Sequence, residues 1–114
     1  MVRCPLVLGA ATLGVGLATL AFAQDAKSVE RGKALVSEQK CRTCHTIAGA
    51  GNPKGVLDGI GSKLSAAEIR DWLTNPRDMA TKAKADRKPP MISFKNLPPE
   101  DLDALVAYVS SLKK

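Results

Sequence analysis

Apolar residues recur with helical spacing in three segments of the chain. The first stripe consists of Val29, Gly32, Leu35 and Val36. Ser28 precedes it as a candidate N-cap, so the pattern predicts an amphipathic helix over residues 28–39. Glycine weakens a helix, and the close approach of another helix would account for Gly32; a tolerated surface glycine is the alternative.

The second and third stripes predict two further helices. Ser65-Ala66-Ala67-Glu68 has the form of a capping box and begins a helix that should end at Asn75-Pro76. Pro98-Pro99-Glu100-Asp101 begins the last helix. The two stripes are Ile69, Trp72 and Leu73, and Leu102, Leu105, Val106, Val109 and Leu112.

The segments between the stripes predict loops. Residues 48–61 hold five glycines and a proline, which regular elements do not accept. Residues 77–90 are polar and basic and predict a charged loop, with a turn of helix near residues 78–84. No segment alternates with a period of two, so we expect an all-α protein without a sheet.

The N-terminal segment has the pattern of an export signal. Arg3 supplies a positive charge, residues 5–20 are uncharged and apolar, and Ala21-Phe22-Ala23 is an A-x-A cleavage site. We expect residues 1–23 to be removed on export and residues 24–114 to form one domain. A retained membrane anchor is the alternative, but the apolar run is shorter than the about 20 residues of a membrane span.

Composition narrows the class of partner. The expected mature chain carries 16 Lys/Arg against 11 Asp/Glu, a net charge of +5. It lacks a helix-turn-helix pattern or stacking aromatics, which argues against nucleic-acid binding. An acidic protein partner suits this moderate positive charge better.

One motif prescribes a cofactor by its spacing. In Cys41-Arg42-Thr43-Cys44-His45, two thiols can bond to the vinyl groups of a haem while the imidazole binds its iron. A zinc site needs about four Cys/His ligands, and a thioredoxin-like dithiol needs a βαβ pattern that the sequence lacks. Cys4 would leave with the signal, so no structural disulfide is expected. The motif therefore predicts one covalently bound haem c.

The second axial ligand of the iron decides between electron transfer and ligand binding. His45 is the one histidine, so Met79 and Met91 remain as soft donors in the expected mature chain. Met91 is the better candidate because Pro89-Pro90 stiffens its segment, whereas Met79 fits gap-filling packing. The alternative for Met91 is a buried methionine beside an empty site. Three apolar side chains are expected to contact the haem: Leu57, Ile60 and Trp72.

The chain resembles a small class I c-type cytochrome of the bacterial periplasm. The resemblance rests on the helix with Gly32, Cys41-x-x-Cys44-His45, Leu57-Asp58-Gly59-Ile60-Gly61, Trp72-Leu73-Thr74-Asn75-Pro76, Pro90-Met91-x-x-Phe94 and Leu105-Val106-Ala107-Tyr108-Val109. It implies a compact bundle of about four helices around one haem. The first and last helices would cross with Gly32 near Tyr108, and His45 and Met91 would be the axial ligands.

One segment departs from the family pattern. The family usually has a proline two positions before the leucine of the L-x-G segment, and the carbonyl of that proline accepts a hydrogen bond from the far ring nitrogen of the histidine. Here that position is Gly55, while the proline is Pro53. Which residue supplies the carbonyl is left open.

The resemblance implies a one-electron carrier without substrate chemistry, which shuttles between periplasmic or membrane-bound redox partners of a respiratory chain. The candidate docking residues are Lys82, Lys84, Arg87, Lys88 and Arg42. A solvated loop is the alternative for these charges. A second hypothesis is that the chain is the haem subunit of a larger oxidoreductase. A third is that it is a peroxidase or a gas-binding protein with an open sixth site. The lack of a distal histidine argues against peroxidase chemistry.

Overall fold

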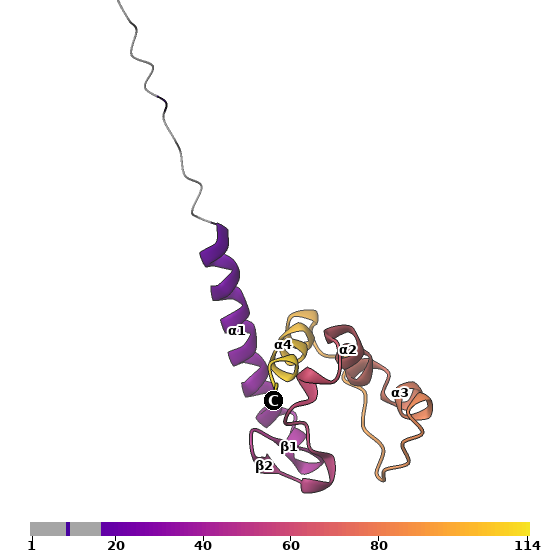
Figure 1. Cartoon of the computed structure of the whole chain (residues 1–114). Coiled ribbons are helices and arrows are strands. Elements are labelled where there is room, and N and C mark those ends of the chain that lie inside the picture. Colours follow the sequence, from indigo (N-terminus) through magenta and orange to yellow (C-terminus); the bar gives the residue numbers. More distant parts are fainter. Residues whose placement is uncertain (1–8, 10–16) are drawn as a thin grey trace, which may run out of the picture.

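The first and last helices of the chain cross, and the core lies at their crossing (Figure 1). The computed structural model describes Gly9 and residues 17–114. Helix α1 (Leu17–Glu38) packs on α4 (Pro99–Ser110), α2 (Ala66–Thr74) covers another part of α4, and α3 (Pro76–Lys82) follows α2. The helix-dominated architecture confirms the expected all-α class.

Gly32 lies where α1 and α4 come closest. A Cβ atom on Gly32 would overlap the carbonyl oxygen of Ala104 and lie 2.5 Å from the Cβ of Tyr108. The buried residues Leu35 and Leu105, each 1% exposed, lie in the core that this close approach creates. The predicted close approach at Gly32 is therefore confirmed.

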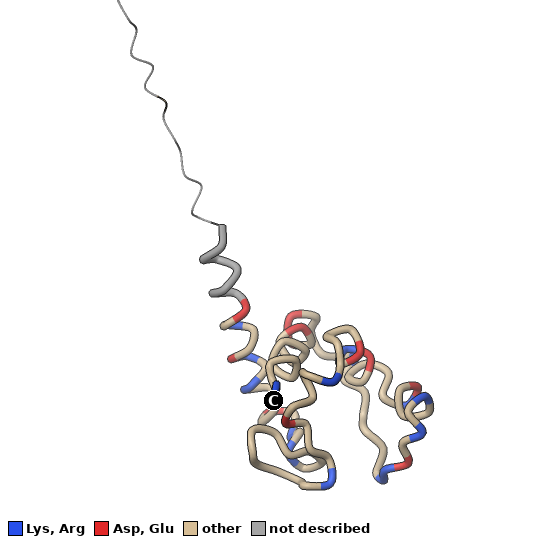
Figure 2. The backbone as a smooth tube through the Cα atoms, in the orientation of Figure 1, with Lys and Arg blue, Asp and Glu red and all other residues tan. Residues whose placement is uncertain are grey.

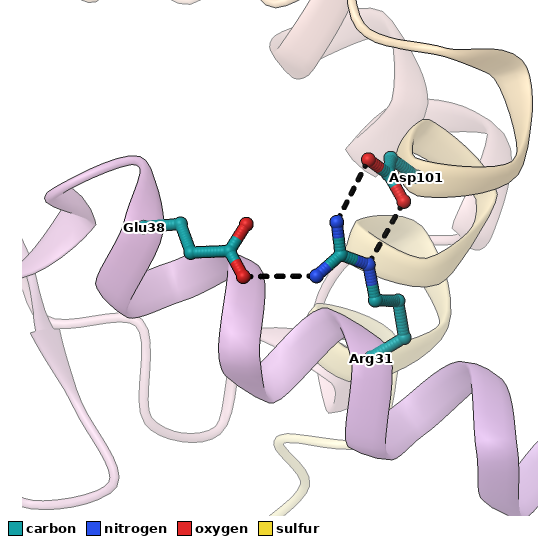
Figure 3. Close-up of polar contacts among 3 residues, drawn as sticks. All are labelled: Arg31, Glu38 and Asp101. Carbon is teal, nitrogen blue, oxygen red and sulfur yellow. Dashed lines mark hydrogen bonds and ion pairs between the residues drawn. The ribbon is translucent and has the colours of Figure 1, made fainter.

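An ion-pair network fastens the outer side of this crossing (Figure 3). The Arg31 guanidinium donates to both carboxylate oxygens of Asp101, at 2.9 and 3.0 Å, and to Glu38 at 2.9 Å. The hydrogen bonds from Arg31 hold the pKa of Asp101 below its usual range. Exposed ion pairs stabilise proteins little, so this network mainly selects how α1 meets α4.

Local signals fix the start and end of α2 as the sequence predicted. Ser65 Oγ accepts a hydrogen bond from the Glu68 amide, and Glu68 accepts one from the Ser65 amide, both at 3.1 Å. The helix ends at Thr74, and Pro76 begins α3. The buried face of α2 consists of Ile69 and Leu73.

The expectation of a protein without a sheet is wrong at one place. Strands β1 (Thr46–Ile47) and β2 (Ala50–Gly51) pair antiparallel across a tight turn. Ala48 and Gly49 both have positive φ, and the Asp58 carboxylate accepts hydrogen bonds from their amides at 2.7 and 2.9 Å. Strands of two residues are too short to show alternation, so the pattern did not reveal them.

Three short 3₁₀ turns complete the chain between α1 and α2: η1 (Cys41–Thr43), η2 (Pro53–Gly55) and η3 (Ile60–Ser62). Helix α1 begins at Leu17 instead of Ser28, because the intervening residues are rich in good helix formers. The predicted signal, residues 1–23, lies largely outside the described residues. Among the helices described, none combines the length and hydropathy of a membrane span.

Candidate cofactor site

The turn η1 presents both cysteines directly after α1. Lys40 adopts a left-handed conformation that turns the chain, and the amides of Cys44 and His45 donate to the Cys41 carbonyl at 3.2 and 3.0 Å. Both thiols are free and half-buried. Burial raises the pKa of the Cys41 thiol, so this group stays protonated at neutral pH. The motif thus offers two reduced thiols on one short turn.

The imidazole of His45 is oriented by the backbone of η2. Its Nδ1 atom lies 2.9 Å from the Gly55 carbonyl oxygen. A carbonyl can only accept, so the proton of the neutral ring belongs on Nδ1 and Nε2 is left free for a metal. The position that the sequence left open is therefore Gly55 and not Pro53.

The electrostatic surroundings keep this imidazole neutral. Burial lowers the pKa of His45 most, the Gly55 carbonyl opposes that effect, and the positive charge of Arg87 lowers it further. A neutral ring is the form that binds a metal through nitrogen. The ring therefore needs no proton loss before it can act as a ligand.

Asn52 fastens the turn η2 to the cysteine motif. Its amide donates to the His45 carbonyl at 3.1 Å, and its carbonyl accepts from Thr46 Oγ1 at 2.8 Å. Its side chain accepts from the Lys54 amide at 3.0 Å, which caps the turn. These bonds fix where the Gly55 carbonyl points.

Gly55 has no room for a side chain. A Cβ atom there would overlap the Cys44 carbonyl oxygen and the Nη1 atom of Arg87, and would lie 2.9 Å from His45 Nδ1. Arg87 was predicted only as a docking residue, so its position beside the histidine was missed. The glycine at this position was the only trace of the contact in the sequence.

Met91 lies in a segment anchored to the end of α2. The Phe94 amide donates to the Leu73 carbonyl at 2.8 Å, and Ser93 Oγ donates to the Thr74 carbonyl at 2.7 Å. Met91 itself is half-buried and packs against the core. Met79, the other candidate, is half-buried on α3.

The three predicted haem neighbours are all half-buried. Leu57 and Ile60 pack against the core from the segment around η3, and Trp72 lies on α2 beside the buried Leu73. Each keeps part of its apolar surface uncovered, as expected of side chains that line the place of a flat apolar group. With the free thiols and the free Nε2, these residues fit a covalently bound haem.

Positive charge gathers on α3 and on the segment that follows it (Figure 2). Lys82, Lys84, Arg87 and Lys88 are all exposed there, whereas Arg42 is half-buried in η1 and donates to the Ile47 carbonyl at 3.2 Å. Within residues 17–114, no group of three or more His, Cys, Asp or Glu side chains lies together as a metal site would require.

A family model described as Cytochrome c matches residues 29–113. The matched range includes every predicted site residue, from Cys41 to Met91. Searches of curated proteins and of solved structures gave no match.

Proposed function

The chain belongs to the cytochrome c family, whose members carry covalently bound haem c with iron and transfer electrons, and on that premise we propose a one-electron carrier with His45 and Met91 as axial ligands. The hydrogen bond from His45 Nδ1 to the Gly55 carbonyl carries this proposal. It leaves Nε2 as the nitrogen for iron and makes the ring a stronger ligand.

Each residue of the site has a defined task in this proposal. Cys41 and Cys44 would form the covalent links to the haem, and His45 and Met91 would hold its iron. A methionine thioether as ligand would favour ferrous iron and raise the reduction potential. The haem would supply the one-electron couple, and side chains held in place by the protein would need little movement when the oxidation state changes.

The basic segment suits an acidic redox partner. Lys82, Lys84 and Lys88 are exposed and close together in the sequence, in the segment that leads to Met91. Such a cluster attracts acidic surfaces over a distance comparable to the Debye length, about 10 Å at 0.1 M salt. We therefore include docking of an acidic partner at this segment in the proposed function, and export to the periplasm as its setting.

The absorption spectrum of the ferric protein tests the axial ligation. The protein is produced in cells that attach haem covalently, and the weak far-red charge-transfer band of sulfur-ligated ferric haem is measured. We expect the wild type and Met79→Ala to show the band and Met91→Ala to lose it. A high-spin wild-type spectrum, or a band lost in Met79→Ala alone, would contradict the proposed ligand.

A further inference from the structure

Arg87 lies in the segment that follows α3 and bears Met91 (residues 83–94, the Met91 segment). It contacts the turn η2, whose Gly55 carbonyl orients His45 (the His45 turn). It lies four residues before Met91, in a stretch over residues 81–90 whose side chains are all exposed. Nevertheless, its Nη1 atom fills the space beside Gly55 that a Cβ atom would occupy. The long arginine side chain thus contacts the backbone on the histidine side of the site.

The surroundings of Gly55 favour a cation. The same point beside its Cα adjoins both Arg87 Nη1 and the Cys44 carbonyl oxygen, so the guanidinium lies near the negative end of a peptide dipole. Within residues 17–114, Arg87 donates no side-chain hydrogen bond to this carbonyl or to any other group, so its contact with Gly55 is one of packing and charge. Opposite charge and dipole attract here, although Arg87 is exposed and solvent screens part of that attraction.

The Met91 segment has few other attachments on the N-terminal side of Met91. The amides of Lys84 and Ala85 bond back to α3, and within residues 17–114 the stretch 86–92 makes no hydrogen bond with another residue. After Met91, Ser93 and Phe94 fasten the segment to α2. One side of the Met91 segment is therefore held by hydrogen bonds and the other by the contact of Arg87.

We propose that Arg87 is a positioning residue that fastens the Met91 segment to the His45 turn through Gly55, and so keeps the Met91 sulfur on the iron. This inference rests on the proposed ligation by Met91. A side chain at position 55 would displace the guanidinium as well as overlap the Cys44 carbonyl oxygen. Arg87 is then a part of the closed haem site and not only one of several docking charges.

Binding of added imidazole to the ferric protein measures how readily this site opens, because imidazole can reach the iron only after Met91 has left it. The variants are Arg87→Gln, and Lys88→Gln as a matched control that removes the same charge from the next residue. Arg87→Lys keeps the charge but lacks the planar fork of the guanidinium. Unfolding by urea is recorded for each variant, so that a general loss of stability is recognised.

We expect imidazole to bind about tenfold faster to Arg87→Gln than to the wild type. This factor corresponds to a loss of about 1.4 kcal/mol in the free energy that keeps Met91 on the iron. Lys88→Gln should stay within about twofold of the wild type, and Arg87→Lys should lie between the two. The urea midpoints should change little, since the core at the α1–α4 crossing is untouched.

Two results would overturn the positioning role and leave the electron carrier standing. In the first, Arg87→Gln binds imidazole as slowly as the wild type; in the second, Arg87→Gln and Lys88→Gln accelerate binding equally, which would show an effect of charge alone. A different result, wild-type binding as fast as that of Met91→Ala, would overturn the proposed ligation itself and the inference with it.

Discussion

The Nδ1 atom of His45 donates a hydrogen bond of 2.9 Å to the carbonyl oxygen of Gly55. This bond makes the turn η2 a support for His45, the proposed iron ligand, and places the backbone of one residue at the centre of the site. A backbone acceptor cannot be removed by truncating a side chain. The neighbourhood of Gly55 is therefore where substitutions act on the ligand.

Replacing Gly55 by alanine should loosen the histidine side of the site. The new Cβ would overlap the Cys44 carbonyl and Arg87 Nη1, so the turn must shift and weaken its bond to His45. We expect a loss of about 1–3 kcal/mol in the free energy of unfolding of the holoprotein, together with a changed reduction potential. Lys54→Ala, an exposed change in the same turn, is the control and should leave both quantities nearly unchanged.

The helix crossing makes Gly32→Ala strongly destabilising. A methyl group there must push α1 away from Ala104 and Tyr108, which costs about 1–3 kcal/mol or more. Lys33→Ala changes an exposed neighbour on α1 and should have no such cost. Urea unfolding of the two variants measures the difference. Equal midpoints would show that the helices can separate at this point without penalty.

The ion pair between Arg31 and Asp101 should make the free energy of unfolding depend on pH in the acidic range. Its hydrogen bonds lower the pKa of Asp101 in the folded state, so its contribution is present above the ordinary carboxyl pKa of about 3.9. This stabilising contribution is lost as the pH falls through the lowered pKa of Asp101 in the folded protein. Asp101→Asn should therefore be less stable than the wild type at neutral pH and approach it in acid.

Glu100→Gln serves as the control for this profile, because the structure shows no ion pair for Glu100 within residues 17–114. Thermal unfolding at a series of pH values gives the comparison. If Asp101→Asn and Glu100→Gln follow the same curve, the ion pair contributes nothing measurable.

Docking by the basic segment predicts electron transfer that slows as salt rises. Neutralising Lys82, Lys84 and Lys88 together should flatten the dependence of the rate on ionic strength with an acidic redox partner. The matched control replaces three lysines in other parts of the chain: Lys27, Lys33 and Lys63. A slope that stays the same after the first triple replacement would exclude these lysines from docking.

Export predicts a defined N-terminus for the protein isolated from the periplasm. Mass spectrometry of the haem-loaded protein should give a chain that begins at Gln24, since cleavage would follow Ala21-Phe22-Ala23. A chain that keeps Met1 and stays with the membrane fraction would instead support the anchor alternative.

The features that the sequence predicted well depend on neighbouring residues. The capping box at Ser65 and Glu68 begins α2 because both partners lie within one turn. The haem motif from Cys41 to His45 could be predicted for the same reason, because all of its residues lie within five positions. Gly32 revealed a contact across the fold because a glycine in an amphipathic stripe is costly unless another element comes close.

The features that the sequence did not predict depend on backbone direction or on long side chains. The choice of Gly55 over Pro53 as acceptor follows from how Asn52 turns the chain, and no residue type encodes that directly. The contact of Arg87 with Gly55 depends on the path of the chain between α3 and Met91. The hairpin at Ala48 and Gly49 depends on hydrogen bonds to the Asp58 carboxylate. Asp58 lies in the same predicted loop, and the sequence did not indicate this contact.

The crossing of α1 and α4 also sets an order of events in the life of the chain. Arg31 and Asp101, which meet there, are 70 residues apart, so in the proposed export α1 would lack its packing partner until nearly all of the polypeptide has crossed the membrane. Cys41 and Cys44 arrive much earlier, directly behind α1. On that proposal the two thiols would be accessible for haem attachment before α4 packs on α1 and completes the core.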